Sequence, residues 1–168
     1  MNNLPIIGTG FDTHAFAGEN EKRDLYLAGL FWEGQNGLLG NSDGDVACHA
    51  IADSLLNAAG MEDIGQFLQE EKVGVKIEGI SGLKILELVY SAISKHGYTI
   101  GNISAQIISN SPKFAPRREE AEKVISKALN GAKISISATT TDGLGFAGRG
   151  EGIATIANCL IYKSQFTN

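Results

Sequence analysis

The spacing of apolar and polar residues predicts the main elements of the chain. Runs rich in apolar, β-branched and aromatic residues predict strands over residues 6–16, 25–32, 98–109, 133–139 and 153–162. Apolar residues at helical spacing predict helices over residues 43–59, 83–96 and 116–129. The charged segment 18–24 is expected to join the first two strands as a hairpin. Residues 61–82 have no clean period and are expected to form a long loop.

Together these elements predict a single α+β domain over residues 1–168. Its sheet is expected to be mostly antiparallel, with four to five strands and with three helices packed on one face. A chain of 168 residues can bury one good core and is short for two.

Residues 41–53 read as a loop that enters a helix. Ser42 and Asp45 give a capping-box-like start, and the backbone N–H groups of residues 41–44 are expected to open the helix and to point at an incoming phosphate. Asp45 and Asp53 each fall about 40° to one side of His49 on a helical wheel. A histidine between two carboxylates is a candidate metal ligand or base. A surface histidine in two i,i+4 pairs explains this helix equally well.

The segment 10–16 favours a metal-ligand role for His49 over the surface-histidine interpretation. In an extended strand Asp12 and His14 project from the same face, because side chains alternate with a period of two. Together with His49 they make an Asp/His/His set, which suits zinc with an open fourth position for substrate or water. We therefore expect a zinc site built from these three residues.

Composition and charge exclude several classes of function. The net charge of −5 and the scattered basic residues leave no footprint for nucleic acid or for an anionic membrane. The only cysteines are Cys48 and Cys159, which fits a reducing compartment. Cys48 points about 100° away from His49 and is expected in the core. No stretch approaches the ~18 apolar residues of a membrane span, and no leader pattern opens the chain, so a cytoplasmic protein is expected.

Residues 139–142 place three hydroxyls and the Asp142 carboxylate at the end of a strand. Mg²⁺ commonly takes one or two carboxylates while it shares phosphate oxygens with a substrate. Taken alone, the motif is better explained as a strand end followed by a turn-forming aspartate. Lys113 follows Pro112 in a turn and could bind an anionic or nucleobase group, although alone it reads as a solvated lysine.

Several separated motifs in one order resemble a known family. They are Gly8-x-Gly10-Phe11-Asp12-x-His14-Ala15-Phe16, Ser42-Asp43-Gly44-Asp45-Val46-Ala47-x-His49-Ala50, Asp63-Ile64-Gly65, Pro112-Lys113, Ala138-Thr139-Thr140-Thr141 and Leu144-Gly145-Phe146-x-Gly148-Arg149-Gly150-Glu151-Gly152. The chain resembles the 2-C-methyl-D-erythritol 2,4-cyclodiphosphate synthase family almost from end to end.

The resemblance implies an enzyme of the non-mevalonate isoprenoid pathway that is a homotrimer with active sites between adjacent subunits. In 4-diphosphocytidyl-2-C-methyl-D-erythritol 2-phosphate, the 2-phosphate attacks the β-phosphorus, CMP leaves, and the cyclic diphosphate remains. Zinc, or another divalent transition metal, would lie on Asp12, His14 and His49, and magnesium or manganese would lie on Asp142 with the substrate diphosphate.

The resemblance also assigns the remaining site residues. The catalytic positions are Asn41 and Thr140. The implied substrate-binding residues are Ser42, Asp63, Gly65, Ser109, Asn110, Ser111, Pro112, Lys113, Phe114, Ala115, Thr139, Thr140, Thr141, Phe146 and Arg149.

The chain departs from the family pattern at a few positions. The family usually has histidine where this chain has Asn41 and glutamate where it has Asp142, and the segment after Gly65 lacks the usual motifs. One alternative is therefore a non-catalytic, zinc-bound trimer that binds cytidine nucleotides or isoprenoid diphosphates. Another is a metal-dependent phosphodiesterase that uses water and gives a linear product.

Overall fold

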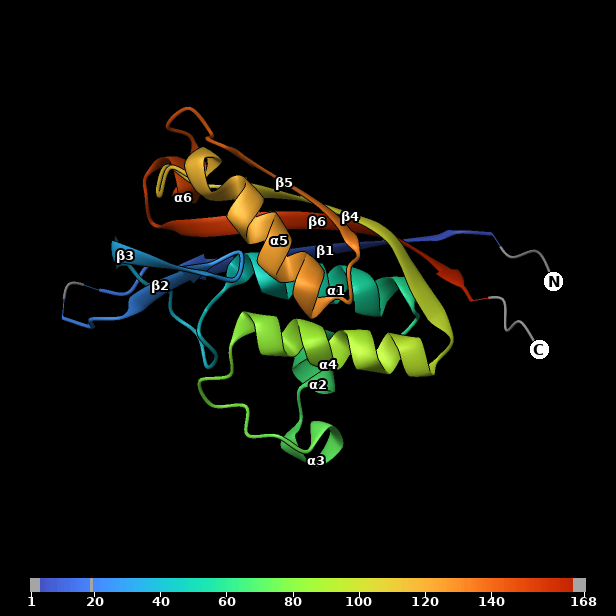
Figure 1. The fold of residues 1–168 in the computed structure, drawn as a ribbon. Coiled ribbons are helices and arrows are strands. Elements are labelled where there is room, and N and C mark those ends of the chain that lie inside the picture. Colours follow the sequence, from blue (N-terminus) through green and yellow to red (C-terminus); the bar gives the residue numbers. More distant parts are fainter. Residues whose placement is uncertain (1–3, 19, 165–168) are drawn as a thin grey trace.

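The computed structural model describes residues 4–18 and 20–164, and its centre is a four-stranded sheet in the order β1-β6-β4-β5 (Figure 1). These strands are β1 (Ile6–Ala15), β6 (Gly152–Lys163), β4 (Tyr98–Ile108) and β5 (Lys133–Thr139). A separate two-stranded hairpin is formed by β2 (Asp24–Leu27) and β3 (Leu30–Asn36). The fold is thus α+β, as predicted.

The sheet is mixed, which corrects the prediction of a mostly antiparallel one. Strand β6 is antiparallel to β1 and to β4, but β4 and β5 run parallel, from the pair Asn102↔Lys133 to the pair Ile108↔Thr139. Parallel neighbours need a long crossover, and here α5 (Arg118–Ala128) supplies it. The order strand, helix, strand in this part of the sequence was the available signal for a parallel pair.

The expected hairpin between residues 6–16 and 25–32 is also wrong. Strand β1 pairs with β6 along its whole length, from Ile6↔Ile161 to Ala15↔Gly152. Residues 25–32 instead fold back on themselves at Ala28 and Gly29, whose φ angles of 54° and 76° suit a two-residue hairpin turn. The segment between β1 and β2 is too long for such a tight turn, so β1 is free to pair with the long C-terminal strand.

The three predicted helices are present as α1 (Val46–Ala58), α4 (Gly82–Lys95) and α5. Helix α1 starts later than expected, because Asp45 is its N-cap. The expected long loop contains two short helices, α2 (Ile64–Phe67) and α3 (Glu70–Val73), and a one-turn 3₁₀ helix (Ala115–Arg117) precedes α5. A further short helix, α6 (Gly145–Gly148), precedes β6. None of the helices described is both long and apolar enough to cross a membrane.

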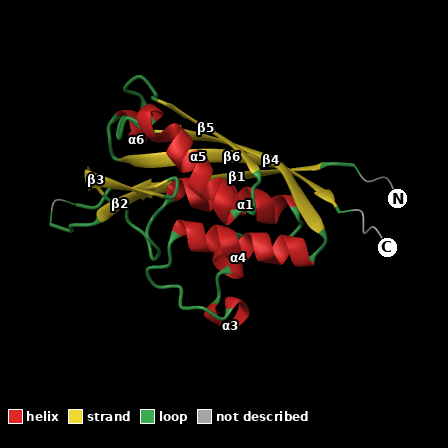
Figure 2. Cartoon of the chain, viewed as in Figure 1, coloured by secondary structure: helices red, strands yellow, loops and turns green. Residues whose placement is uncertain are grey.

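The long helices lie on one side of the sheet, as the sequence predicted (Figures 1 and 2). Helix α1 packs on β1 and β6, α5 on β5, and α4 on α1. The β4 residues that face the helices, Ile103, Ala105 and Ile107, are buried. None of the helices in residues 4–18 and 20–164 covers the other face of the sheet.

Gly8 and Gly10 let α1 lie directly against β1. A Cβ atom on Gly10 would lie 2.0 Å from the Ala50 carbonyl oxygen, and one on Gly8 would lie 2.0 Å from the Ser54 carbonyl oxygen. Real Cβ contacts are never this short, so any larger residue would push the helix away from the strand. The two glycines therefore set the distance between β1 and the helix that carries His49.

We expect Gly10→Ala to lower the free energy of unfolding by about 3 kcal/mol, because overpacking against backbone cannot be relieved by a rotamer change. Gly18→Ala is the matched control, since a Cβ there meets nothing within 4 Å. It should change stability by less than about 0.5 kcal/mol. Urea titrations of both variants measure the difference. Equal midpoints for Gly10→Ala and the parent chain would contradict this account of the helix contact.

Candidate active site

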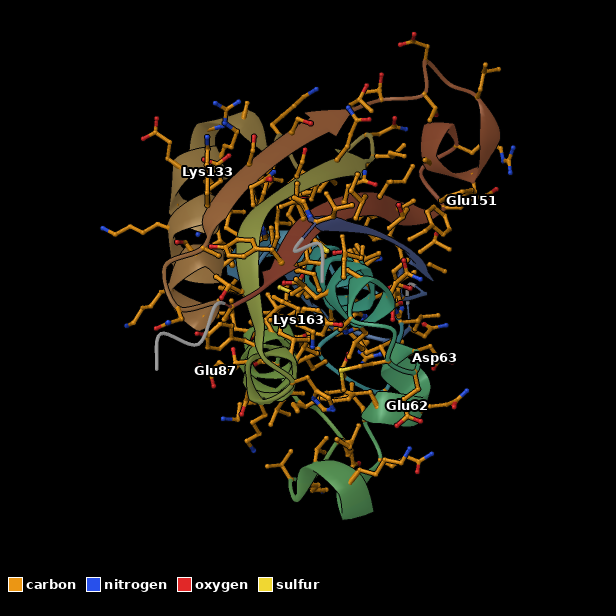
Figure 3. All side chains as sticks on the ribbon, turned by 90° about the vertical axis from the view of Figure 1, so that its right-hand side faces the viewer. Glu62, Asp63, Glu87, Lys133, Glu151 and Lys163 are labelled. Carbon is orange, nitrogen blue, oxygen red and sulfur yellow. The ribbon has the colours of Figure 1, made fainter. Side chains whose placement is uncertain are left out.

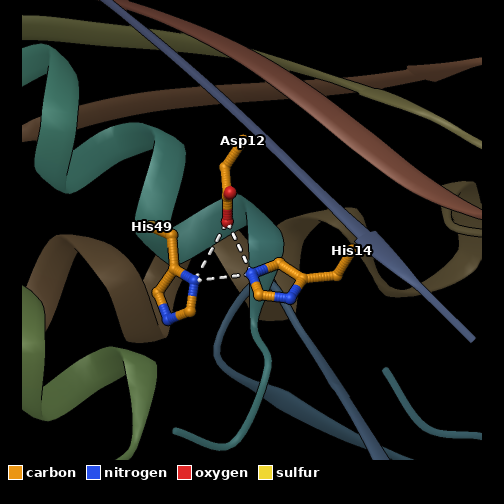
Figure 4. A group of neighbouring side chains, drawn as sticks. All are labelled: Asp12, His14 and His49. Carbon is orange, nitrogen blue, oxygen red and sulfur yellow. Dashed lines mark hydrogen bonds and ion pairs between the residues drawn. The ribbon is translucent and has the colours of Figure 1, made fainter. Parts of the chain in front are cut away.

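Asp12, His14 and His49 converge on one point (Figure 4). Asp12 Oδ2 lies 3.0 Å from His14 Nε2 and 3.0 Å from His49 Nδ1, and the two ring nitrogens are 3.3 Å apart. Ligands about 2.0 Å from a tetrahedral zinc ion are roughly 3.3 Å from one another, so the spacing fits three of its four positions. The structure thus brings together the three residues that the sequence predicted as metal ligands.

The second nitrogen of each imidazole is held by the loop before α1. His14 Nδ1 donates to the carbonyl of Leu39, which can only accept, so in the neutral ring His14 Nε2 directs its lone pair toward the centre. His49 Nε2 lies 3.0 Å from the hydroxyl of Ser42, and His49 Nδ1 faces the centre. A carboxylate oxygen and imidazole nitrogens directed at one point form a donor set that fits a divalent cation.

The three groups also polarise one another. Burial would raise the pKa of Asp12, but hydrogen bonds from His14 and His49 outweigh it and hold that pKa well below its usual range. The same hydrogen bond to Asp12 raises the pKa of His14, against the opposing effect of burial. Asp12 is therefore a carboxylate at neutral pH, as a metal ligand must be.

The expected flanking of His49 by Asp45 and Asp53 is wrong. The Asp45 carboxylate accepts from Ala28 N at 2.8 Å and Gly29 N at 2.6 Å in the hairpin turn. Asp53 accepts from the N–H of Ile64 at 2.9 Å. Asp45 and Asp53 thus bond backbone groups, whereas His49 lies against Asp12, His14 and Ser42.

Two of the four backbone N–H groups expected to bind a phosphate, those of Asp43 and Gly44, are engaged within the chain. Asp43 N donates to the Ile80 carbonyl at 3.1 Å, and Gly44 N donates to Ser42 Oγ at 3.2 Å. Two N–H groups in the first turn of α1, those of Ala47 and Cys48, donate to the N-cap carboxylate of Asp45. The N–H groups of Asp43 and Gly44 are therefore not available to a phosphate, and α1 begins only at Val46 rather than at residues 41–44.

Cys48 is a core residue, as predicted. It is fully buried, and burial raises the pKa of its thiol well above the ordinary value. Its Sγ donates to Asp45 Oδ2 at 3.2 Å, on a different side of the helix from the triad.

A pocket of about 430 Å³ opens over the triad. Besides the triad, its lining includes Asn41, Ser42 and Gly65, all of which the family resemblance had implied. The pocket is also lined by four apolar residues, of which only Ile64 stood in a family motif; they are Ile64, Leu68, Ile77 and Ile85. Three of these four belong to the stretch 61–82 without a clean period, so no regular pattern marked them.

A second pocket of about 250 Å³ lies where β4 and β5 end. This pocket is lined by residues that were predicted to bind the nucleotide. They are Ser109, Asn110, Pro112, Lys113, Phe114, Ala115, Thr139 and Thr140. Phe114 is buried against Trp32, with ring centroids 6.1 Å apart, so its side chain serves the core. Asn110 Nδ2 donates to the Gly148 carbonyl at 2.8 Å and ties this pocket to α6.

The remaining predicted residues line neither pocket. Asp63 is the N-cap of α2 and accepts from Gln66 N at 2.9 Å. Figure 3 shows Asp63 beside α2, well apart from Glu151, which follows the α6 segment and pairs with Arg149 at 2.7 Å. The others are exposed or half-buried, and they are Ser111, Thr141, Asp142 and Phe146.

Comparison with known proteins identifies the family of the chain. A family model described as the YgbB family matches residues 6–162. The chain belongs to the YgbB family. YgbB relatives include the 2-C-methyl-D-erythritol 2,4-cyclodiphosphate synthase of Bifidobacterium longum subsp. infantis, which is 44% identical over 94% of this chain and 96% of the relative. The bifunctional enzyme IspD/IspF of Tropheryma whipplei is 46% identical over 95% of this chain, which spans only 37% of that relative.

Solved structures of IspF and IspDF proteins share the fold. The IspF of Plasmodium falciparum in complex with CDP superposes with a TM-score of 0.82 at 30% identity, covering 98% of this chain and 100% of that one. The bifunctional IspDF of Campylobacter jejuni gives a TM-score of 0.89 at 31% identity, covering 99% of this chain and 44% of that one. The chain thus corresponds to one part of the bifunctional proteins and to nearly all of the single ones.

We expect His49→Ala to lose the bound metal while the chain stays folded, because two donors cannot hold zinc against water. His96→Ala is the matched control, since His96 caps α4 and bonds its own turn at Ala92. Zinc content by elemental analysis after dialysis, with circular dichroism for folding, makes the comparison. One zinc per chain in purified His49→Ala would show that the ligand set is misassigned.

Proposed function

We propose that the chain is a 2-C-methyl-D-erythritol 2,4-cyclodiphosphate synthase, a phosphorus–oxygen lyase, with one synthase domain over residues 1–168. It would convert 4-diphosphocytidyl-2-C-methyl-D-erythritol 2-phosphate to the cyclic diphosphate and CMP. The observation that carries the proposal is the convergent Asp/His/His donor set at the base of the 430 Å³ pocket. The named YgbB relatives support the choice of reaction.

The residues in this pocket suit a reaction whose nucleophile belongs to the substrate. The attacking group is the substrate's own 2-phosphate, so the chain needs only to position it and to offset charge. A zinc ion, or another divalent transition metal, held by Asp12, His14 and His49 would polarise the β-phosphate. Ser42 Oγ accepts from Gly44 N and can accept from His49 Nε2, which leaves its own proton to donate to a phosphate oxygen. Asn41 is exposed beside it, with a neutral amide donor.

The second pocket would hold the cytidine end of the substrate. A relative with this fold is a CDP complex, which supports a cytidine nucleotide as ligand. In this assignment residues 109–115 surround the base and Thr139 and Thr140 hold the diphosphate. Phe146 and Arg149 would contribute from α6 and the residue after it, to which Asn110 is tied.

Magnesium or manganese would bind beside this pocket, at Asp142. The Thr140 hydroxyl donates to Asp142 Oδ1 at 3.1 Å, so the two predicted groups already lie together. The Asp142 side chain is exposed, and a hard ion that keeps several waters suits one such carboxylate shared with substrate phosphate oxygens. Thr141 would support this turn, since its hydroxyl donates to the Leu144 carbonyl at 2.5 Å.

We expect the chain to release CMP from the authentic substrate only when a transition metal and magnesium are both present. Separate titrations of zinc and magnesium, with the products resolved by phosphorus NMR, test this. A cyclic diphosphate in equal amount to CMP is the expected result. A linear product would identify a phosphodiesterase, and tight CDP binding without turnover would identify the non-catalytic alternative.

We also propose that the chain forms a homotrimer with active sites between subunits. On one chain the two pockets are separated by strands β6 and β4, through the register Asp12↔Thr155↔Ile107↔Ala138. Asp12 and Ala138 are thus three strand spacings apart, which is about 14 Å. The uncovered sheet face carries Phe11, which is 55% exposed and pairs with the 38% exposed Ile156. Burying this face between chains would remove that apolar surface from water and could bring the two pockets of different chains together.

We expect the parent chain to sediment as three copies, and Phe11→Asp to shift it toward smaller species, because a charge would be buried in the interface. Phe31→Asp is the matched control, as Phe31 is 45% exposed on β3, outside the four-stranded sheet. Analytical ultracentrifugation over a tenfold range of concentration measures both. A monomeric parent chain at all concentrations would refute the trimer.

A further inference from the structure

Arg23 reaches from the segment before β2 to the loop before α1. Its Nη1 donates to the Gly40 carbonyl at 3.0 Å, and its Nη2 lies 3.4 Å from the Ser42 carbonyl. These two carbonyls belong to the residues on either side of Asn41. A planar guanidinium with two forked donors can bridge them in a way that an ammonium group cannot. Arg23 therefore fixes the backbone on both sides of Asn41.

Two hollows share Asn41, and Arg23 lines one of them. Asn41 lines both the 430 Å³ pocket over the triad and an adjoining hollow of about 680 Å³. Arg23 lines the second hollow, together with Glu21 and Glu78. Among the described residues that line these two hollows, Arg23 is the only lysine or arginine.

The charge of Arg23 is not neutralised by an ion pair within residues 4–18 and 20–164, where its hydrogen-bond partners are both backbone carbonyls. The N–H groups that could otherwise have met an anion here, those of Asp43 and Gly44, are already bonded within the chain. Asn41 itself is neutral. Among the described residues that line the adjoining hollow, the guanidinium is therefore the one fixed positive charge, and Glu21 and Glu78 line the same hollow.

We propose that Arg23 is a positioning residue of the phosphate end of the substrate site. It holds Asn41 and Ser42 at the pocket rim through the two carbonyls, and its charge favours a phosphate group beside them. This inference rests on the proposed function for its substrate, but its phosphate-binding part does not require turnover. The two contributions, geometry and charge, are separable by substitution.

Arg23→Gln removes the charge, and Arg23→Lys keeps the charge but cannot bridge both carbonyls. With zinc-loaded protein and inorganic pyrophosphate as the probe, calorimetry should show about tenfold weaker binding for Arg23→Gln and a loss of no more than about threefold for Arg23→Lys. Lys22→Gln is the matched control, because Lys22 is exposed on the same segment and should leave binding unchanged. Zinc content and the thermal midpoint are measured for each variant.

In turnover, Arg23→Gln should raise KM and lower kcat, each about tenfold, whereas Arg23→Lys should recover most of KM and little of kcat. Parent-like pyrophosphate binding by Arg23→Gln with normal zinc content would overturn the proposal, as would equal losses of pyrophosphate binding in the Lys and Gln variants. If Arg23→Gln does not fold, parent-like kcat in Arg23→Lys overturns the positioning role. Absence of CMP release by the parent chain refutes the proposed function alone, since pyrophosphate binding still decides the role of Arg23.

Discussion

The carboxylate of Asp45 is the constraint on which the site depends. It is almost fully buried, and it accepts N–H groups from Ala28 and Gly29 in the β2–β3 turn and from Ala47 and Cys48 in α1. A buried charge is stable only when its acceptor positions are filled, so hairpin turn and helix start are held together as one unit. This fixes the residue at which α1 begins and, one turn later, the direction of His49.

The unit formed by the hairpin turn and the start of α1 contacts β1 at two glycines. Gly8 and Gly10 allow the backbone of α1 to contact the strand, and Asp12 and His14 continue the same face of β1. The metal donor set is thus built from two elements whose separation and relative register are each fixed by backbone contacts. The loop that supplies the Leu39 carbonyl and the Ser42 hydroxyl then determines which nitrogen of each imidazole faces the centre.

The parts of this arrangement that follow from local pattern were predictable. Period-two alternation placed Asp12 with His14, helical spacing located α1, α4 and α5, and the separated motifs identified the family. The predictions that were wrong concerned contacts between residues that are distant in sequence. Asp45 was assigned to His49 because they are four residues apart, whereas its partners at Ala28 and Gly29 lie in another element. Arg23 was one charge among several in a polar segment, and only the folded chain shows which carbonyls it reaches.

The parallel pairing of β4 with β5 has a consequence for how the second pocket can be assembled. Parallel neighbours finish at the same edge of a sheet, and Ser109 N accordingly donates to the Thr139 carbonyl at 3.0 Å just beyond the last pair, Ile108↔Thr139. Had β5 run the other way, Thr139 would lie at the opposite end of a seven-residue strand, about 20 Å from Ser109. The crossover through α5 therefore returns the chain to the edge of the sheet at which β4 begins. As a result Ser109 and Thr139, thirty positions apart in sequence, lie at the same edge of the sheet and line the same pocket.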